Sequence, residues 1–160
     1  WTGKTVATII YDSKVDPFTD QGLFDKVKGK ENIALVAFTT DGDVFGGFYN
    51  VSVTEQKKSF YDPNMFVFSF ESRGRCETPQ RFPVKDSVRS KKYVHFNKDS
   101  NYGFVNVGGD YGYFYLGNEK TYTNCYELSR GFEGIKHNTL TGKSNGWGFT
   151  CTRIVAVHLQ

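Results

Sequence analysis

Cysteine is scarce in this chain, and its pattern excludes both a disulfide framework and a cysteine-ligated metal site. The 160 residues include only Cys76, Cys125 and Cys151, and no two of them form a CxxC pair. A chain of this length can bury a stable core without disulfides, so an odd number of thiols is typical of a reducing compartment. We therefore expect free thiols and a location in the cytoplasm, with the nucleus as the alternative.

Long apolar segments are absent as well. No stretch approaches the roughly 20 consecutive apolar residues that cross a lipid bilayer. Residues 1–8 lack the basic and then apolar layout of a signal peptide. We expect no membrane span. Because the chain begins at Trp1 instead of Met, we expect residues 1–160 to be a single domain cut from a longer protein.

Histidine is rare, and the three histidines lie too far apart in the sequence for a recognised metal site. They are His95, His137 and His158, and none has a second ligand at zinc spacing. His95 and His158 fall in predicted strands, so either could meet Cys151 across a sheet and form a cysteine–histidine nucleophile. Apart from such a pair the sequence contains no catalytic constellation, and we predict no enzyme activity, no metal and no cofactor.

Two short segments resemble ligand-binding loops but lack essential residues. Asp41 and Asp43 place two carboxylates in a turn, yet the further oxygen ligands of a calcium loop do not follow. Residues 137–144 end in Gly-Lys-Ser like a phosphate-binding loop, but His137 replaces the first glycine. That replacement removes much of the backbone nest that holds phosphates. We interpret the first segment as a hairpin turn and do not expect phosphate binding at the second.

Aromatic residues are plentiful, and they predict a mainly β protein. The chain has 15 phenylalanines and 10 tyrosines, and aromatic residues favour strands over helices. One short helix is expected after the first strand, with Asp16 or Thr19 as its cap and Gly29 at its end. This helix should pack as a lid on a sheet, because its apolar face consists of Leu23, Phe24 and Val27.

Apolar segments separated by turn residues predict a series of strands. Asp41-Gly42 between two apolar runs is a strong hairpin signal. The pair Gly46 and Gly47 inside a strand indicates a bulge or a close approach of two backbones. Glycine turns between the later strands predict a β-meander. The expected strands cover residues 5–11, 33–38, 44–49, 65–70, 93–96, 103–107, 111–116 and 148–159.

The order of these segments resembles the TLDc domain of oxidation-resistance proteins. Residues 44–48, Val-Phe-Gly-Gly-Phe, match the family's pattern of a hydrophobic residue, Phe, Gly, a small residue and Phe. Residues 66–70 match its aromatic strand, and Gly108-Gly109 matches its later glycine run, which is usually longer. The last strand has Ala-Val-His at 156–158 where an acidic residue and a Trp are common. The likeness extends from residue 9 to residue 158, and the chain looks like a divergent member.

This resemblance implies a fold and a class of function. The implied fold class is mainly β (α+β), a two-sheet antiparallel β-sandwich with one or a few short flanking helices. The family is linked to protection from oxidative stress, and several members bind the vacuolar proton-pumping ATPase. No accepted catalytic mechanism accompanies it. We therefore expect a non-catalytic domain that binds a protein partner, with the vacuolar ATPase (V-ATPase) as the first candidate.

A basic segment at residues 81–98 is the best surface candidate for partner binding. Its cations face only Asp86, so it could dock an acidic protein surface or phosphates. Interleaved aromatic residues would suit the stacking of bases, although at strand spacing they also supply a core face. A nucleic-acid-binding regulator of a stress response is therefore the second hypothesis. The candidate partner-binding residues are Arg81, Lys85, Arg89, Lys91, Lys92 and Lys98.

Cys76 supports a third hypothesis, a weak thiol-based redox protein. Arg73 and Arg75 precede it in the sequence, and nearby cations favour a reactive thiolate. The alternative is an inert loop cysteine. Cys151 lies in an alternating terminal strand and is expected in the core, whereas the sequence does not decide the position of Cys125.

Overall fold

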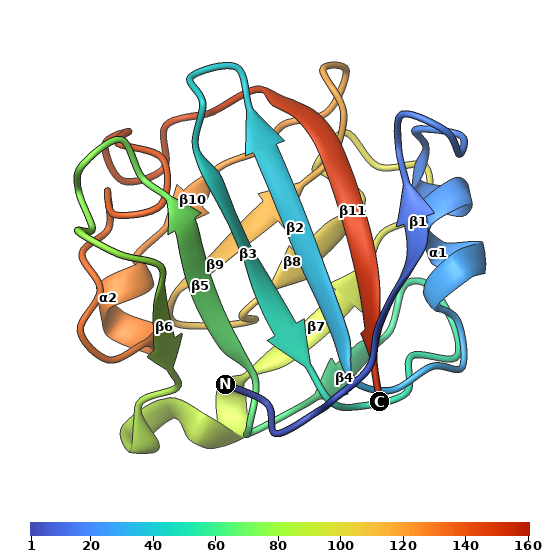
Figure 1. Ribbon diagram of the computed structural model, residues 1–160, viewed down its shortest axis with the longest axis horizontal. Helices are drawn as coiled ribbons and strands as arrows, with labels where there is room; N and C mark the ends of the chain where they lie inside the picture. Colours follow the sequence, from blue (N-terminus) through green and yellow to red (C-terminus); the bar gives the residue numbers. More distant parts are fainter.

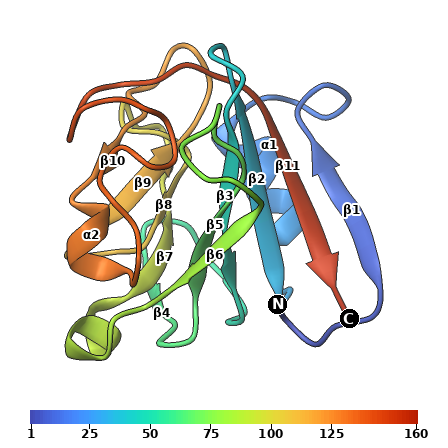
Figure 2. The ribbon, with the colours of Figure 1, turned by 60° about the vertical axis from the view of Figure 1, so that its left-hand side comes forward.

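Strands make up most of the regular structure, in agreement with the abundance of phenylalanine and tyrosine. The computed structural model describes all residues from 1 to 160. Its strands form two antiparallel sheets that pack face to face, with short helices at their edges (Figures 1 and 2). The predicted two-sheet β-sandwich is therefore confirmed.

The two sheets differ in size. The six-stranded sheet has the order β1 (Ala7–Asp12), β11 (Cys151–Leu159), β2 (Ile33–Thr39), β3 (Val44–Tyr49), β5 (Phe66–Glu71) and β6 (Gln80–Pro83). The five-stranded sheet has the order β10 (Cys125–Tyr126), β9 (Tyr113–Leu116), β8 (Val105–Val107), β7 (Tyr93–Phe96) and β4 (Ser59–Tyr61). The helices are α1 (Asp20–Val27), the 3-10 helix η1 (Asp86–Lys91) and α2 (Leu128–Gly131). None of these helices has the length and apolar character needed to cross a bilayer.

The hairpin of β2 and β3 shows why this sequence has glycines inside a strand. The two strands pair antiparallel as predicted, and Gly42 turns the chain between them with a φ of 90°. A Cβ atom at Gly46 would collide with the carbonyl oxygen of Leu35. A Cβ atom at Gly47 would lie 2.5 Å from Val107 of the second sheet. Both glycines therefore permit a close approach, which confirms one of the two alternatives predicted for the pair.

Helix α1 begins and packs as its sequence predicts. The second of the two proposed caps, Thr19, accepts a hydrogen bond from the Gly22 N–H at 3.0 Å, which satisfies one free donor of the first turn. The helix covers one edge of the sandwich beside β1 (Figure 1). It buries its apolar face, which consists of Leu23, Phe24 and Val27.

The later strands follow the predicted order, but β8, β9 and β11 each begin two or three residues later than predicted. Strands β7, β8 and β9 form the expected meander. The terminal strand begins at Cys151 and not at Gly148, because the preceding residues pair elsewhere. Phe149 donates its N–H to the carbonyl of Thr123 at 3.1 Å, and Gly148 forms an isolated bridge with Asn124.

The core between the sheets is filled by side chains from both sheets and from α1. Phe45 and Phe114 meet edge to face across it, with ring centroids 5.4 Å apart. Cys151 is buried there, as predicted, and Cys125 is buried with it. Burial raises the pKa of both thiols, that of Cys151 to about 12, because a thiolate is poorly solvated in an apolar interior.

Candidate protein-binding surfaces

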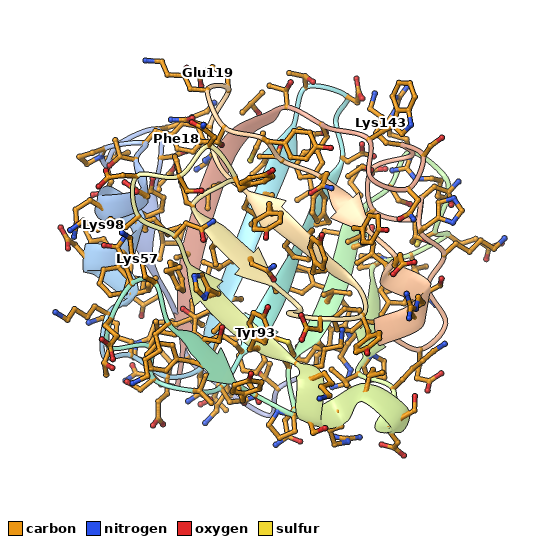
Figure 3. The ribbon with its side chains drawn as sticks, turned by 180° about the vertical axis from the view of Figure 1, so that it is seen from behind. Phe18, Lys57, Tyr93, Lys98, Glu119 and Lys143 are labelled. Carbon is orange, nitrogen blue, oxygen red and sulfur yellow. The ribbon has the colours of Figure 1, made fainter.

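The outer face of the five-stranded sheet consists of aromatic and neutral polar side chains. Along β9, Phe114 and Leu116 are buried in the core, so Tyr113 and Tyr115 point outward. The other strands of this sheet follow the same alternation. Their outward residues form a set that we call the tyrosine face: Ser59, Tyr61, Tyr93, His95, Asn106, Tyr113, Tyr115 and Tyr126. Figure 3 looks onto this face, with Tyr93 labelled.

Neighbouring rings of the tyrosine face contact one another. The ring centroids of Tyr113 lie 5.3 Å from Tyr115 and 5.7 Å from Tyr126. The loops beside the sheet extend this array, because the ring of Tyr102 lies 6.0 Å from both Tyr115 and Tyr122. Such edge-to-face and tilted pairs hold aromatic side chains in fixed positions without burying them. The result is an ordered aromatic surface.

Most of the tyrosines of the chain gather here. Of the ten tyrosines, Tyr11 and Tyr49 are fully buried, and the remainder lie on the tyrosine face or in the loops at its border. This surface was not predicted from the sequence. A signal was present, because Tyr113 and Tyr115 alternate with core residues, but only the sheet order brings the tyrosines of four strands together.

The tyrosine face carries no charged side chain at its outward positions, and its border is partly acidic. The Tyr93 hydroxyl donates to Asp110 at 3.4 Å. Burial and the Asp110 carboxylate raise the pKa of Tyr93 to about 12, so its hydroxyl stays neutral. Exposed tyrosines are enriched at the energetic centres of protein interfaces. A neutral aromatic surface with an acidic border therefore suits a protein partner better than phosphates.

The predicted basic segment does not form one surface. Arg81 lies on the outer face of the six-stranded sheet, with its guanidinium 5.2 Å from the ring centroid of Phe66. Lys98 follows β7 and lies near α1 on the opposite side of the molecule from η1 (Figure 3). The neighbouring Asp99 confirms this position, because its N–H donates to Asp20 of α1 at 2.7 Å. These two cations therefore do not act together.

Three cations of the segment remain close together around η1. Lys91 is exposed at its end. Arg89 pairs with Asp86 at 2.5 Å, and the Lys85 Nζ donates to the carbonyl of Ser129 at 2.6 Å. Two of the three cations thus already have partners within the chain.

Lys92 requires a correction, because the sequence analysis placed it among the partner-binding residues. Its relative exposure is 0%. The side chain turns inward, and its Nζ donates to the carbonyl oxygens of Asp110, Tyr111 and Gly112. The alternation of β7 explains the difference, since Lys92 precedes an outward residue, Tyr93. Lys92 cannot contact a partner at the surface.

Cys76 is half-buried and packs against the core. Its N–H donates to the Oγ of Ser72 at 2.6 Å. The guanidinium of the adjacent Arg75 turns away and pairs with Asp43, and its Nε donates to the carbonyl of Thr139 at 2.9 Å. The nearest cation in the sequence is therefore engaged elsewhere.

The segment that resembles a phosphate-binding loop has the wrong polarity for phosphate. The carbonyl oxygens of Thr139 and Leu140 accept from Arg75 at 2.9 and 3.2 Å. The Gly142 N–H is bonded to the carbonyl of Asn138 at 2.8 Å. A phosphate nest needs free N–H groups that converge on an anion. Here carbonyl groups converge on a cation.

The histidines and cysteines do not form the nucleophilic pair that the sequence left open. The Nδ1 of His95 lies 3.1 Å from the Oγ of Ser59. The Sγ of Cys151 lies 3.3 Å from the carbonyl of Arg153. No group of three or more histidine, cysteine or acidic residues is placed to hold a metal ion.

The outer face of the six-stranded sheet is a second apolar surface, and Trp1 packs on part of it. The ring of Trp1 stacks on Phe70 with centroids 5.9 Å apart, and Arg81 donates to the Trp1 carbonyl at 2.7 Å. The N-terminal segment thus crosses this face (Figure 1). The apolar residues of this outer face form a cluster that is separate from the main core and consists of Val36, Phe48, Phe66, Phe68 and Val155.

Comparison with known proteins agrees with this architecture. The family model described as the TLDc domain matches residues 3–154. A comparison with curated proteins finds no match. The family match supports a protein-interaction domain related to oxidative stress. Because the matched residues cover nearly the whole chain, the protein belongs to the TLDc domain family.

Proposed function

We propose that this TLDc domain binds a protein partner through the tyrosine face as part of a cytoplasmic response to oxidative stress. The vacuolar proton-pumping ATPase is the first candidate partner. One observation carries the proposal: neutral tyrosine side chains from four of the five strands, with Asn106 of β8 between them, form one surface. Tyrosine supplies a large contact area at a low entropic cost, and its hydroxyl can donate or accept a hydrogen bond.

The distribution of charge favours a protein over a nucleic acid as the partner. Binding of single strands needs a positive groove that follows the phosphates beside the stacking rings. The border of the tyrosine face instead carries Asp110 next to Tyr93 and Glu127 near Tyr113. Arg130, the cation nearest to Glu127, is paired with it at 2.5 Å. At this part of the border, phosphates would meet the carboxylates of Asp110 and Glu127.

The test is a binding measurement between the purified domain and purified vacuolar ATPase at physiological salt. The test variant combines Tyr113→Ala and Tyr126→Ala, which removes two adjoining rings and leaves the core residues of both strands unchanged. We expect at least about 30-fold weaker binding, since hot-spot tyrosines typically contribute 2 kcal/mol or more. The matched control is Lys91→Glu, an exposed change on η1, which should alter the affinity by less than about 3-fold.

Different outcomes separate the hypotheses. Equal binding by the wild type and the tyrosine variant, with loss in Lys91→Glu, would assign the interface to the basic segment. Binding to a nucleic acid that falls steeply with salt would favour the stress-response regulator instead. No binding of the wild-type domain to the ATPase would exclude this candidate partner.

A further inference from the structure

Lys92 sits in a cage of backbone carbonyl groups. Its Nζ lies 3.0, 2.9 and 2.8 Å from the carbonyl oxygens of Asp110, Tyr111 and Gly112. On another side, the Nζ lies 4.5 Å from the ring centroid of Phe132. The side chain is fully buried, and none of the ion pairs of the chain includes it.

The cage matches the ammonium form of lysine. An ammonium group has three N–H donors, one for each carbonyl, whereas a neutral amine has two donors and a lone pair. The contact with the ring also needs the positive charge. Burial acts against that charge and lowers the pKa of Lys92 to about 7. The carbonyl groups and the ring therefore offset only part of the cost of burying the charge.

The cage connects the loop at 108–112 with helix α2, and neither of these segments is part of a sheet. Residues 108–112 form a loop in which Gly108, Gly109 and Gly112 have φ values of 115°, 67° and 104°. Helix α2 contacts the same nitrogen, since a Cβ atom at Gly131 would collide with the Lys92 Nζ. Glycines allow this loop many backbone conformations. The N–H groups of Gly108, Gly109 and Asp110 are bonded to neighbouring residues, and Lys92 holds the carbonyl groups at the other end of the loop.

The residues that form the cage also border the tyrosine face. Asp110 and Tyr111 contribute carbonyls to Lys92, while the carboxylate of Asp110 accepts from the hydroxyl of Tyr93. The ring of Tyr111 lies 5.0 Å from the guanidinium of Arg130 on α2. A shift of the loop would therefore move side chains at the edge of the proposed interface.

Other charged groups on the surrounding elements are engaged with their own partners. Arg130 and Glu127 pair with each other, and Lys85 is bonded to the Ser129 carbonyl. In the segment between β4 and β5, the carboxylate of Asp62 accepts from Asn50 and Asn64. The group that acts electrostatically on Lys92 is Asp110, which favours the charged form.

We propose that Lys92 is a positioning residue of the tyrosine face: its side chain latches the loop at 108–112 to α2 and so fixes the border at Tyr93, Asp110 and Tyr111. The inference rests on the proposed function only in assigning the tyrosine face to a partner. The latch itself is a property of the isolated chain and can be measured without one.

The experiment is amide hydrogen exchange, followed by NMR, in the wild type, Lys92→Met and Lys91→Met. Methionine keeps much of the length of lysine without its charge, and Lys91→Met is a matched change at the exposed neighbour. The N–H groups of Gly108, Gly109 and Asp110 are hydrogen-bonded and report on the loop. We expect their protection factors to fall by at least about 10-fold in Lys92→Met and by less than about 2-fold in Lys91→Met, with β2 and β3 unchanged.

Two results would overturn the latch. One is a folded Lys92→Met protein that keeps wild-type protection at residues 108–110. The other, which applies even when that variant does not fold, is a wild-type protein whose amides at residues 108–110 exchange as fast as those of an unstructured peptide. Binding to the vacuolar ATPase is measured in parallel. Its complete absence in the wild type would count against the proposed function and leave the exchange data to decide the latch.

Discussion

Arg75 and Asp43 form an ion pair that ties the turn between β2 and β3 to the loop that precedes β6. The Asp43 side chain is 1% exposed and that of Arg75 is 23% exposed, so the pair is largely shielded from water. The same guanidinium donates to the carbonyls of Thr139 and Leu140 at 2.9 and 3.2 Å. One arginine thus joins three loops that are distant in sequence.

Arg75→Met should lower the free energy of unfolding by about 3 kcal/mol, because it leaves a buried carboxylate and two carbonyls without their donor. Equilibrium unfolding in urea measures the loss. The double variant Arg75→Met with Asp43→Asn should recover part of it, since the unpaired charge is then gone. A single variant within about 0.5 kcal/mol of the wild type would contradict this account.

Gly46→Ala should prevent stable folding or lower the free energy of unfolding by more than about 3 kcal/mol. The added Cβ would collide with the Leu35 carbonyl oxygen in the paired strand, and backbone atoms of a central strand cannot move away cheaply. The comparison is Gly148→Ala, where the nearest atom would lie 3.3 Å away and the loss should stay below about 1 kcal/mol. Thermal and urea unfolding of the two variants distinguish these outcomes.

Lys92 should make stability depend on pH with a defined sign. Burial lowers its pKa from 10.5 to about 7, so between these values the unfolded chain binds a proton that the native protein lacks. The free energy of unfolding should therefore rise with pH in this window, by up to about 1.4 kcal/mol per pH unit, and Lys92 should contribute little slope well below pH 7. Urea unfolding of the wild type and Lys92→Met, compared at several pH values, isolates this contribution. The opposite slope would mean that the carbonyl cage outweighs burial.

The native protein should react with a thiol reagent at one cysteine per chain. Cys125 and Cys151 are buried and burial raises the pKa of both thiols, whereas Cys76 is half-buried at the edge of a pocket. Cys76→Ser should abolish the reaction in native conditions, and the unfolded wild type should expose three thiols. Protection of cells by a Cys76→Ser protein would exclude the thiol-based redox hypothesis. Rapid labelling of Cys151 in the folded state would contradict the burial argument.

Local patterns were sufficient for much of the fold. The Asp-Gly turn predicted the hairpin of β2 and β3, and the cap at Thr19 with the face of Leu23, Phe24 and Val27 predicted α1. Hairpins and caps depend on residues that are close in sequence, so their physics is visible there. The prediction that the basic segment at 81–98 forms one surface was wrong, because the positions of its cations depend on contacts between residues far apart in the sequence. A strand and a 3-10 helix distribute its cations over different sides, and the fold buries Lys92.

By itself, the sequence determined the class of the fold, the absence of CxxC and zinc-ligand spacing, and the family resemblance, because composition, strand periodicity and glycine turns are local properties. The order of the strands decided the rest. Pairing of β10, β9, β8, β7 and β4 gathers tyrosines from separate segments onto one face, and packing of the loop at 108–112 against α2 creates the carbonyl cage of Lys92. Such surfaces and cages arise from contacts between residues far apart in the chain, and the two sheets have to pair before those contacts exist.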